Sequence, residues 1–406
     1  MSIRDTIAAN WPREVDFLKA LVRVPSDNPP GDCAPAGEVA AQELQALGFT
    51  VERHKVPEGV VKAAGMVSAT NLIVRHAFGK GGPMIALNAH GDVVPPGNGW
   101  TVDPYGAIEK DGALYGRGVA VSKSDFATYA FALKALEENP DGLNGGIELH
   151  FTYDEEAGGM IGPKRLIEQG LTKATLAISA GFSYAITTAH NGVLHLEVTV
   201  SGKQAHAALP ATGADALEAA VPVLAAIYAE RKRLAGIVSK EKGIGSPQIT
   251  VGLISGGINT NVVPDKITFR IDRRIVPDED GAVVERDLIS LIEGATPKTK
   301  GIGVTCRRIM LAEPLRPLPG VERMATAIQR HAREVLGVAV ETTGVPLYTD
   351  ARHYAAAGIP TLLYGAGPRS ILEANAHGAD EHLQLADLRA ATEVIAFTLR
   401  DLLSGV

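Results

Sequence analysis

Residues 85–92 read IALNAHGD. The apolar run at 85–89 predicts a short buried strand, and His90 and Asp92 stand directly after its end. Ligands of open α/β sheets bind at the carboxyl ends of strands. His90 is therefore a candidate metal ligand, with Asp92 hydrogen-bonded to its second ring nitrogen. The alternative is a structural turn that contains one hydrogen-bonded His.

Strands and helices alternate on both sides of this segment. Apolar residues at helical spacing predict a helix over 122–138, and strict alternation predicts a half-buried strand over 147–153. A further apolar strand is expected at 360–364 and an amphipathic helix at 383–403. This alternation predicts an α/β fold, in which helices cover a mixed sheet.

The middle of the chain has a different pattern, typical of a ferredoxin-like β-α-β-β-α-β unit. We therefore expect an inserted domain over 191–308, within a discontinuous α/β domain formed by 1–190 and 309–406. The elements predicted for the insertion are strands near 194–200, 249–253, 267–271 and 302–306, and helices near 214–231 and 282–292.

The composition excludes several classes of protein. The 406 residues include 39 Lys+Arg and 46 Asp+Glu, and a net charge of −7 argues against a nucleic acid or an anionic membrane as partner. Charged residues interrupt the N-terminal segment, and no stretch reaches the roughly 20 apolar residues that span a bilayer. We therefore expect a cytoplasmic protein. Because Cys33 and Cys306 are the two cysteines, a metal ion would be bound by His and carboxylate side chains.

Two further segments carry residue types suited to a metal site. Glu155 and Glu156 follow the strand predicted at 147–153, and adjacent carboxylates can divide the tasks of binding a metal and taking a proton from water. The alternative is a solvated acidic turn. His377 follows a glycine-rich loop and could be a second imidazole ligand; the alternative is the N-terminal approach to a helix.

One His and two Arg complete the candidate residues. His206, in the expected insertion, could stabilise an oxyanion, or it is a surface loop His. Arg274 ends a predicted strand and Arg352 opens a short predicted helix. A guanidinium matches a carboxylate in bidentate geometry, so both are candidates for binding a substrate carboxylate. The alternative for each is a surface ion pair of little energetic weight.

Taken in order, these segments resemble the M20 family of zinc-dependent amidohydrolases, which includes acetylornithine and succinyl-diaminopimelate deacylases, aminoacylases and glutamate carboxypeptidases. The resemblance covers nearly the whole chain. It rests on residues 90–95 (HGDVVP), Trp100 with 103–105 (DPY), 114–118 (LYGRG), 154–156 (DEE), 202–206 (GKQAH), 261–264 (NVVP), 350–352 (DAR), and 376–377 (AH) with Glu381.

The resemblance implies a catalytic α/β domain with an inserted ferredoxin-like dimerisation domain, and hence a homodimer. It implies that His90, Glu156 and His377 are metal ligands. Glu155 would be the general base that activates water, and Asp92 would orient His90.

The resemblance also implies how substrate is bound. His206 would reach the active site of the partner subunit and polarise the scissile carbonyl. Asn261, Arg274 and Arg352 would line the pocket and bind the carboxylate of a small substrate.

Two carboxylates expected from the resemblance are absent, since Val121 and Ala180 stand at their positions. Two divalent ions a few ångström apart repel strongly without a carboxylate between them, so we expect a mononuclear site. Asp125, Ser122 and His190 are the candidates to replace the lost ligands. We expect instead that residues 122–125 (SKSD) form a capping box, with Ser122 as N-cap.

The sequence therefore predicts a hydrolase of C–N bonds with one divalent ion, for which Zn, Mn and Fe fit the ligands. The substrate would be an N-acyl amino acid or dipeptide, or an unusual aromatic or carboxylate compound that releases an amine. The alternatives are a catalytically inactive binding or scaffold protein, and a metal-free hydrolase in which His90 and His377 act as acid and base.

Overall fold

The computed structural model describes residues 2–405. The chain divides into two compact units, and each is described by itself. The first unit comprises residues 2–188, 317–343 and 349–405. The second comprises Ala189–Arg316 and Gly344–Tyr348.

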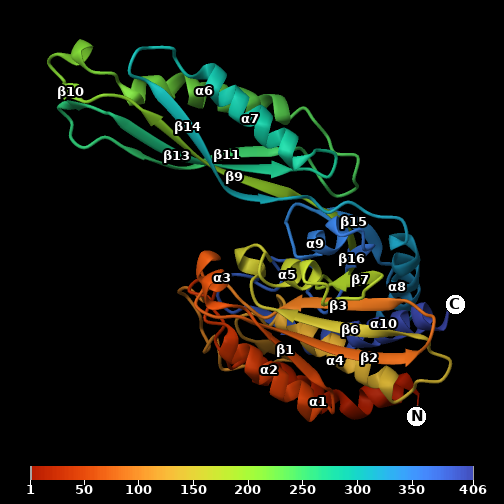
Figure 1. Ribbon diagram of the computed structural model, residues 1–406. Helices are drawn as coiled ribbons and strands as arrows, with labels where there is room; N and C mark the ends of the chain where they lie inside the picture. Colours follow the sequence, from red (N-terminus) through yellow and green to blue (C-terminus); the bar gives the residue numbers. More distant parts are fainter. Residues whose placement is uncertain (1, 406) are drawn as a thin grey trace. The chain divides into compact units, whose positions relative to one another are not determined.

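The first unit is built on a mixed sheet with strand order β1-β2-β6-β3-β7-β16-β8-β15, most of whose strands are labelled in Figure 1. The strand β5 pairs with β4 and β17 in a small separate sheet. Its strands are β1 (Val51–Lys55), β2 (Thr70–Gly79), β3 (Met84–His90), β4 (Ile108–Lys110), β5 (Ala113–Tyr115), β6 (Gly145–Thr152), β7 (Leu176–Ser179), β8 (Ala185–His190), β15 (Glu341–Val345), β16 (Thr361–Leu363) and β17 (His382–Gln384). The last two residues of β8 and of β15 belong to the second unit.

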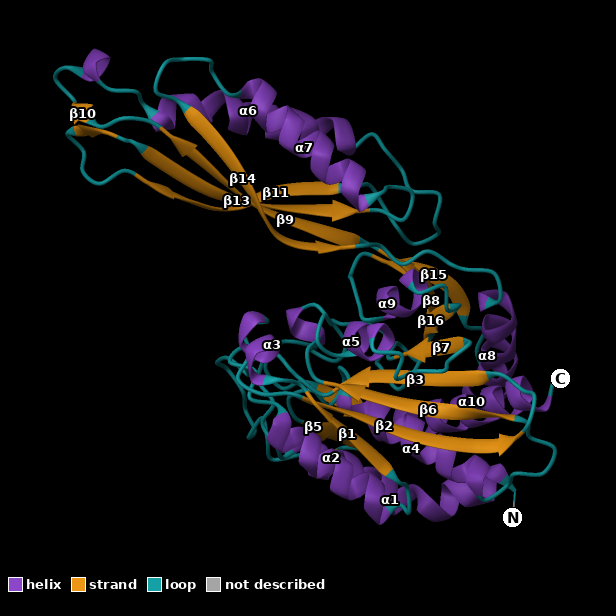
Figure 2. Cartoon of the chain, viewed as in Figure 1, coloured by secondary structure: helices purple, strands orange, loops and turns teal. Residues whose placement is uncertain are grey.

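Helices cover both faces of the large sheet (Figure 2). The helix α4 packs on β3 and β6, with α1 and α10 packed against it, whereas α9 lies against β7 and β16 and contacts α5. The helices are α1 (Ile3–Val22), α2 (Ala34–Ala46), α3 (Glu58–Ala63), α4 (Lys123–Glu137), α5 (Pro163–Glu168), α8 (Val321–Leu336), α9 (Ala351–Ala356) and α10 (Leu385–Ser404).

The strand β3 shows why helices cover both faces of this sheet. Its side chains alternate between the faces, so Ile85 and Leu87 enter the main core while Ala86 packs with Tyr354 of α9. The strand predicted at 147–153 was expected to be half-buried, and this is wrong: all eight residues of β6 are buried. The polar residues Glu148 and His150 face the α9 side, where His150 Nδ1 lies 2.8 Å from the Tyr354 hydroxyl.

The second unit has the predicted order of elements. A four-stranded antiparallel sheet, β11-β13-β9-β14, is covered by α6 and α7, which is the ferredoxin-like arrangement. Leu194, Leu196 and Val198 of β9 alternate into its core. The elements are β9 (Gly192–Ser201), β10 (Ala205–His206), α6 (Ala216–Leu234), β11 (Gln248–Gly256), β12 (Val262–Val263), β13 (Lys266–Ile275), α7 (Gly281–Ala295) and β14 (Gly303–Ala312).

Local chemistry fixes where the two long helices of the second unit begin. The Asp215 carboxylate accepts from the backbone N–H groups of Leu217 and Glu218, and Asp280 accepts from Val283 N–H.

No helix in the described part of the chain, residues 2–405, is long and apolar enough to cross a membrane.

Candidate metal centre

Four parallel strands of the first unit end at the same edge of the large sheet. The strands β6, β3, β7 and β16 are successive parallel neighbours, so their carboxyl ends lie side by side. His90 is the last residue of β3, and Glu155 and Glu156 follow β6. This edge is where open α/β sheets bind ligands.

Three candidate side chains meet at this edge. His90, Glu155 and Glu156 each offer a ligand atom, and these atoms lie within 4.8 Å of one another. His377 extends the group, because its Nε2 lies 3.3 Å from Glu156 Oε1. The backbone of His377 is left-handed, with φ of 64°, and its side chain is 51% exposed. Two imidazoles and two carboxylates at this spacing fit a divalent ion with room for water.

Asp92 connects the members of the cluster. Its Oδ1 lies 3.4 Å from His90 Nδ1 and accepts from Glu155 N–H at 3.2 Å. Its Oδ2 accepts from Glu156 N–H at 3.1 Å and from the Asn28 amide at 2.9 Å. The Asp92 backbone carbonyl lies 3.0 Å from His90 Nδ1 and can only accept, so this contact places the ring proton on Nδ1 and leaves the Nε2 lone pair for an ion.

The acidic turn, residues 154–159, is held from several directions. Asp154 Oδ2 accepts from Ile161 N–H at 2.7 Å, and Gly158 ends the turn in the left-handed conformation, with φ of 103°. The Gly158 carbonyl accepts from the Arg352 guanidinium, and His353 Nε2 lies 3.2 Å from the same oxygen. Because Arg352 also donates to the Thr349 carbonyl at 2.7 Å and is buried, it fixes the turn that carries Glu155 and Glu156.

The electrostatics of this edge favour a bound cation. Burial raises the pKa of Glu155 to about 7 and that of Asp154 to about 7. Burial alone would lower the pKa of His90, but the hydrogen bond to Asp92 and the charges of Glu155 and Glu156 raise it above the usual value. The hydrogen bond to Glu156 raises the pKa of His377. The neighbouring carboxylates therefore favour a positive charge at both imidazoles, whether a proton or a metal ion carries it.

The two apolar replacements belong to the same region of the fold. Val121 is half-buried against the core, and Ala180 directly follows β7, with its N–H donating to the Asn88 carbonyl at 2.8 Å. Glu381, bonded to Arg117 at 2.6 Å, accepts from Ala120 N–H at 3.0 Å and so holds the segment before Val121. Aliphatic side chains offer no lone pair to an ion.

The expected capping box at residues 122–125 is wrong. The Ser122 side chain makes no cap bond; its hydroxyl contacts the backbone N–H and carbonyl of His90, each at 3.0 Å. The Asp125 carboxylate accepts from Ala366 N–H at 2.7 Å and so anchors the loop that leads to His377. In both cases the side chain bonds to a backbone group distant in the sequence, in place of the first turn of the helix. Both side chains are thus bonded to the backbone of neighbouring segments.

The remaining predicted site residues lie in the second unit. His206, on β10, is exposed and accepts from Ala208 N–H at 3.1 Å through Nδ1. Asn261 precedes β12, which pairs with β10 in a two-stranded antiparallel sheet, and its carbonyl accepts from Ala207 N–H at 3.0 Å, so His206 and Asn261 lie close together. Arg274 of β13 is bonded to the Asp272 carboxylate at 2.9 Å. His190, at the end of β8, lies 2.9 Å through Nδ1 from the Asn191 carbonyl.

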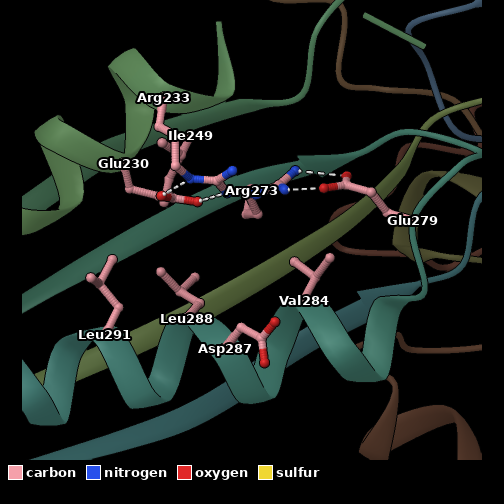
Figure 3. Close-up of a pocket in the computed structure, with 9 residues that line it drawn as sticks. All are labelled: Glu230, Arg233, Ile249, Arg273, Glu279, Val284, Asp287, Leu288 and Leu291. Carbon is pink, nitrogen blue, oxygen red and sulfur yellow. Dashed lines mark hydrogen bonds and ion pairs between the residues drawn. The ribbon is translucent and has the colours of Figure 1, made fainter. Parts of the chain in front are cut away.

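The second unit also holds a cavity of about 240 Å³ between α6, α7 and the sheet (Figure 3). Its charged side chains are paired with neighbours: Arg273 with Glu279 at 2.5 Å, and Arg233 with Glu230 at 2.6 Å. None of the site residues predicted from the sequence is among the described residues that line it. The cavity is thus a gap between α6, α7 and the sheet, in which both guanidinium groups are paired with carboxylates.

Comparisons with known proteins agree with this arrangement. The sequence profile of peptidase family M20/M25/M40 matches residues 86–401. The acetylornithine deacetylase of Myxococcus xanthus is 30% identical over 369 residues, covering 89% of this chain and 90% of that one.

Solved structures share the fold. Aminopeptidase PepT from Bacillus cereus has a TM-score of 0.74 at 22% identity and covers 97% of this chain and 99% of its own. The YXEP protein of Bacillus subtilis, described as a dinuclear metal binding peptidase, has a TM-score of 0.69 at 15% identity, with 98% and 100% coverage.

Proposed function

Because the chain belongs to peptidase family M20/M25/M40, we propose that it is a metal-dependent hydrolase of a C–N bond with a mononuclear site. The substrate would be an N-acyl amino acid or a dipeptide, or a small aromatic or carboxylate compound that releases an amine. The observation that carries this proposal is the convergence of His90, Glu155 and Glu156, with His377 beside Glu156, at the carboxyl edge of the sheet.

His90, Glu156 and His377 would hold the ion, and Zn, Mn and Fe all suit this donor set. When bound, the ion would act as a Lewis acid on the scissile carbonyl and on water. The donors fit such an ion because their ligand atoms are already close together and Asp92 fixes the ring of His90.

Glu155 would be the general base. Its Oε2 lies 4.0 Å from His90 Nε2, in a buried setting that raises its pKa to about 7, close to the value that suits proton transfer at neutral pH. The carboxylate would take a proton from the attacking water and give it to the leaving nitrogen. The water oxygen would then remain on the carbonyl carbon as the C–N bond breaks.

A single ion follows from the missing carboxylates. Val121 and Ala180 cannot place an anion between two metal ions, and the repulsion between two divalent ions would go unscreened. Ser122 and Asp125 support this inference because both side chains are bonded elsewhere.

The second unit would supply substrate contacts and dimerisation. His206 would polarise the carbonyl in the partner subunit, and Asn261 and Arg274 would bind the substrate carboxylate, as the family resemblance implies.

An apolar surface supports a homodimer. The edge strand β11 exposes Leu253 and Ile254, and the adjacent α6 exposes Leu217, Val221 and Tyr228. An exposed edge strand offers unpaired backbone groups to a second copy of the sheet. Sedimentation of the wild type and of Leu253→Glu tests this: a dimer that becomes a monomer is expected, and a wild-type monomer contradicts it.

The alternative is a catalytically inactive scaffold, which the family match and the hydrolase names of the relatives do not favour. One experiment separates the two. The purified protein is screened against N-acyl amino acids, dipeptides and arylamines, beside Glu155→Gln. Turnover by the wild type that is lost in the variant, with the ion still bound, supports the hydrolase. No turnover with any substrate by the ion-loaded wild type supports the scaffold.

A further inference from the structure

A segment of the N-terminal region lies alongside the end of β3. Asp27 pairs in parallel with Val93, the N–H of Val93 donates to the Ser26 carbonyl at 3.0 Å, and the N–H of Asn28 donates to the Val93 carbonyl at 2.8 Å. The Ser26 hydroxyl donates to the Gly91 carbonyl at 2.6 Å. Residues 26–28 are therefore fixed beside the turn that carries His90 and Asp92.

From this position the Asn28 side chain reaches Asp92. Asn28 Nδ2 donates to Asp92 Oδ2 at 2.9 Å, and both residues are buried, with exposed fractions of 7% and 0%. Among the described residues, the other groups that face this carboxylate are the backbone N–H groups of Glu155 and Glu156, which belong to the acidic turn, and His90 Nδ1, 3.4 Å from Oδ1. Asn28 is thus the side-chain donor that ties the Asp92 carboxylate to a segment outside the metal cluster.

We propose that Asn28 is a positioning residue of the ion site, an inference that rests on the proposed function. Its amide fixes the plane of the Asp92 carboxylate, and through Asp92 it sets the ring of His90 and the backbone of Glu155 and Glu156. It acts through Asp92 and does not touch the ion.

The residue type matters for a physical reason. An amide N–H donates to a carboxylate oxygen and adds no charge to the buried contact. An aspartate of nearly the same shape at position 28 would place a second carboxylate against Asp92 in a buried setting, where like charges repel strongly. Orienting groups of this kind affect metal affinity by about 10–100-fold when they are changed.

The test measures Zn²⁺ affinity of the full-length protein by competition with a chelator. The variants are Asn28→Asp and Asn28→Ala, and Ser26→Ala is the matched control, since it removes a side-chain bond of the same segment without touching Asp92. We expect Zn²⁺ to bind about 10–100-fold more weakly in both Asn28 variants and within about twofold of the wild type in the control. Visible spectra of the Co²⁺-loaded proteins should change in the Asn28 variants alone, because they report the geometry of the ligands.

Each other outcome has a definite meaning. If folded Asn28→Ala binds Zn²⁺ as the wild type does, the inference is wrong and the proposed function stands. If Ser26→Ala weakens binding as much, the segment as a whole is structural and Asn28 has no separate role. If the wild type itself binds no divalent ion, both proposals fail. Should Asn28→Asp not fold, Asn28→Ala decides; failure of both to fold assigns Asn28 to stability and overturns the inference.

Discussion

Arg352 has two candidate roles at the site, as a substrate contact or as a support of the acidic turn. The family resemblance assigns it to the substrate carboxylate, whereas in the structure it is buried and bonded to the carbonyls of Gly158 and Thr349. The informative perturbation is Arg352→Ala, with Arg274→Ala as the control, because Arg274 is a second predicted carboxylate ligand and is bonded to Asp272 in the second unit.

The magnitude follows from the bonds that are lost. Hydrogen bonds from a charged group contribute about 1.5–3 kcal/mol each, so two bonds correspond to about 3–6 kcal/mol. In the variant the Gly158 carbonyl still has His353 Nε2 at 3.2 Å as a partner. We therefore expect a loss of stability at the lower end of this range, about 3 kcal/mol. For a chain of 406 residues, at about 2.1 cal/mol/K of unfolding entropy per residue, that lowers Tm by roughly 3–4 °C. Because the freed turn carries Glu155 and Glu156, we also expect ion affinity to fall about tenfold or more.

Thermal unfolding, ion competition and steady-state kinetics on the two variants provide the assay. A fall in Tm, ion affinity and kcat for Arg352→Ala, beside a raised KM alone for Arg274→Ala, supports the positioning role. The reasoning is refuted if Arg352→Ala keeps the wild-type Tm and ion affinity and raises KM at least tenfold, since that pattern belongs to a direct substrate contact.

Three further predictions address the base, the fold and the missing ligands. Glu155→Gln should lower kcat by about 10²–10⁴-fold with unchanged ion content, measured on the same preparation; full activity would exclude Glu155 as base. Burial raises the pKa of Glu14 from 4.5 to about 8, so wild-type stability should fall as pH rises from 4.5 to 8, because the unfolded chain ionises first. Glu14→Gln should therefore gain stability relative to the wild type over that range, by up to several kcal/mol in urea unfolding, and a pH-independent difference would contradict this. Restoring both carboxylates, in Val121→Asp with Ala180→Glu, should raise the ion count from one to two per chain by elemental analysis; a count that stays at one would show that other residues also exclude the second ion.

The convergence of the metal cluster could be predicted from the sequence because its members follow parallel strands. His90 ends β3 and Glu155 and Glu156 follow β6, and parallel neighbours carry such residues to one edge. The β-α-β-β-α-β order of the second unit could also be predicted, because apolar and polar residues alternate along strands that have one buried face.

The supporting contacts could not be predicted, because they depend on long-range packing. Asn28 stands in a loop, 64 residues before Asp92, and nothing local marks it as a donor to that carboxylate. The Ser122 and Asp125 side chains follow a local capping pattern, yet they bond to the His90 backbone and to Ala366 N–H. In β6 the polar residues suggested a solvated face, but the α9 side buries them.

The number of ions per chain tests the central claim most directly. The protein should be purified without chelator, loaded with Zn²⁺, freed of excess ion and analysed for metal and protein content. The account predicts one tightly bound ion per chain, lost when His90 or His377 is replaced by Ala. Two tightly bound ions per chain would contradict the mononuclear site inferred from Val121 and Ala180, and no bound ion would contradict the metal-dependent hydrolase itself.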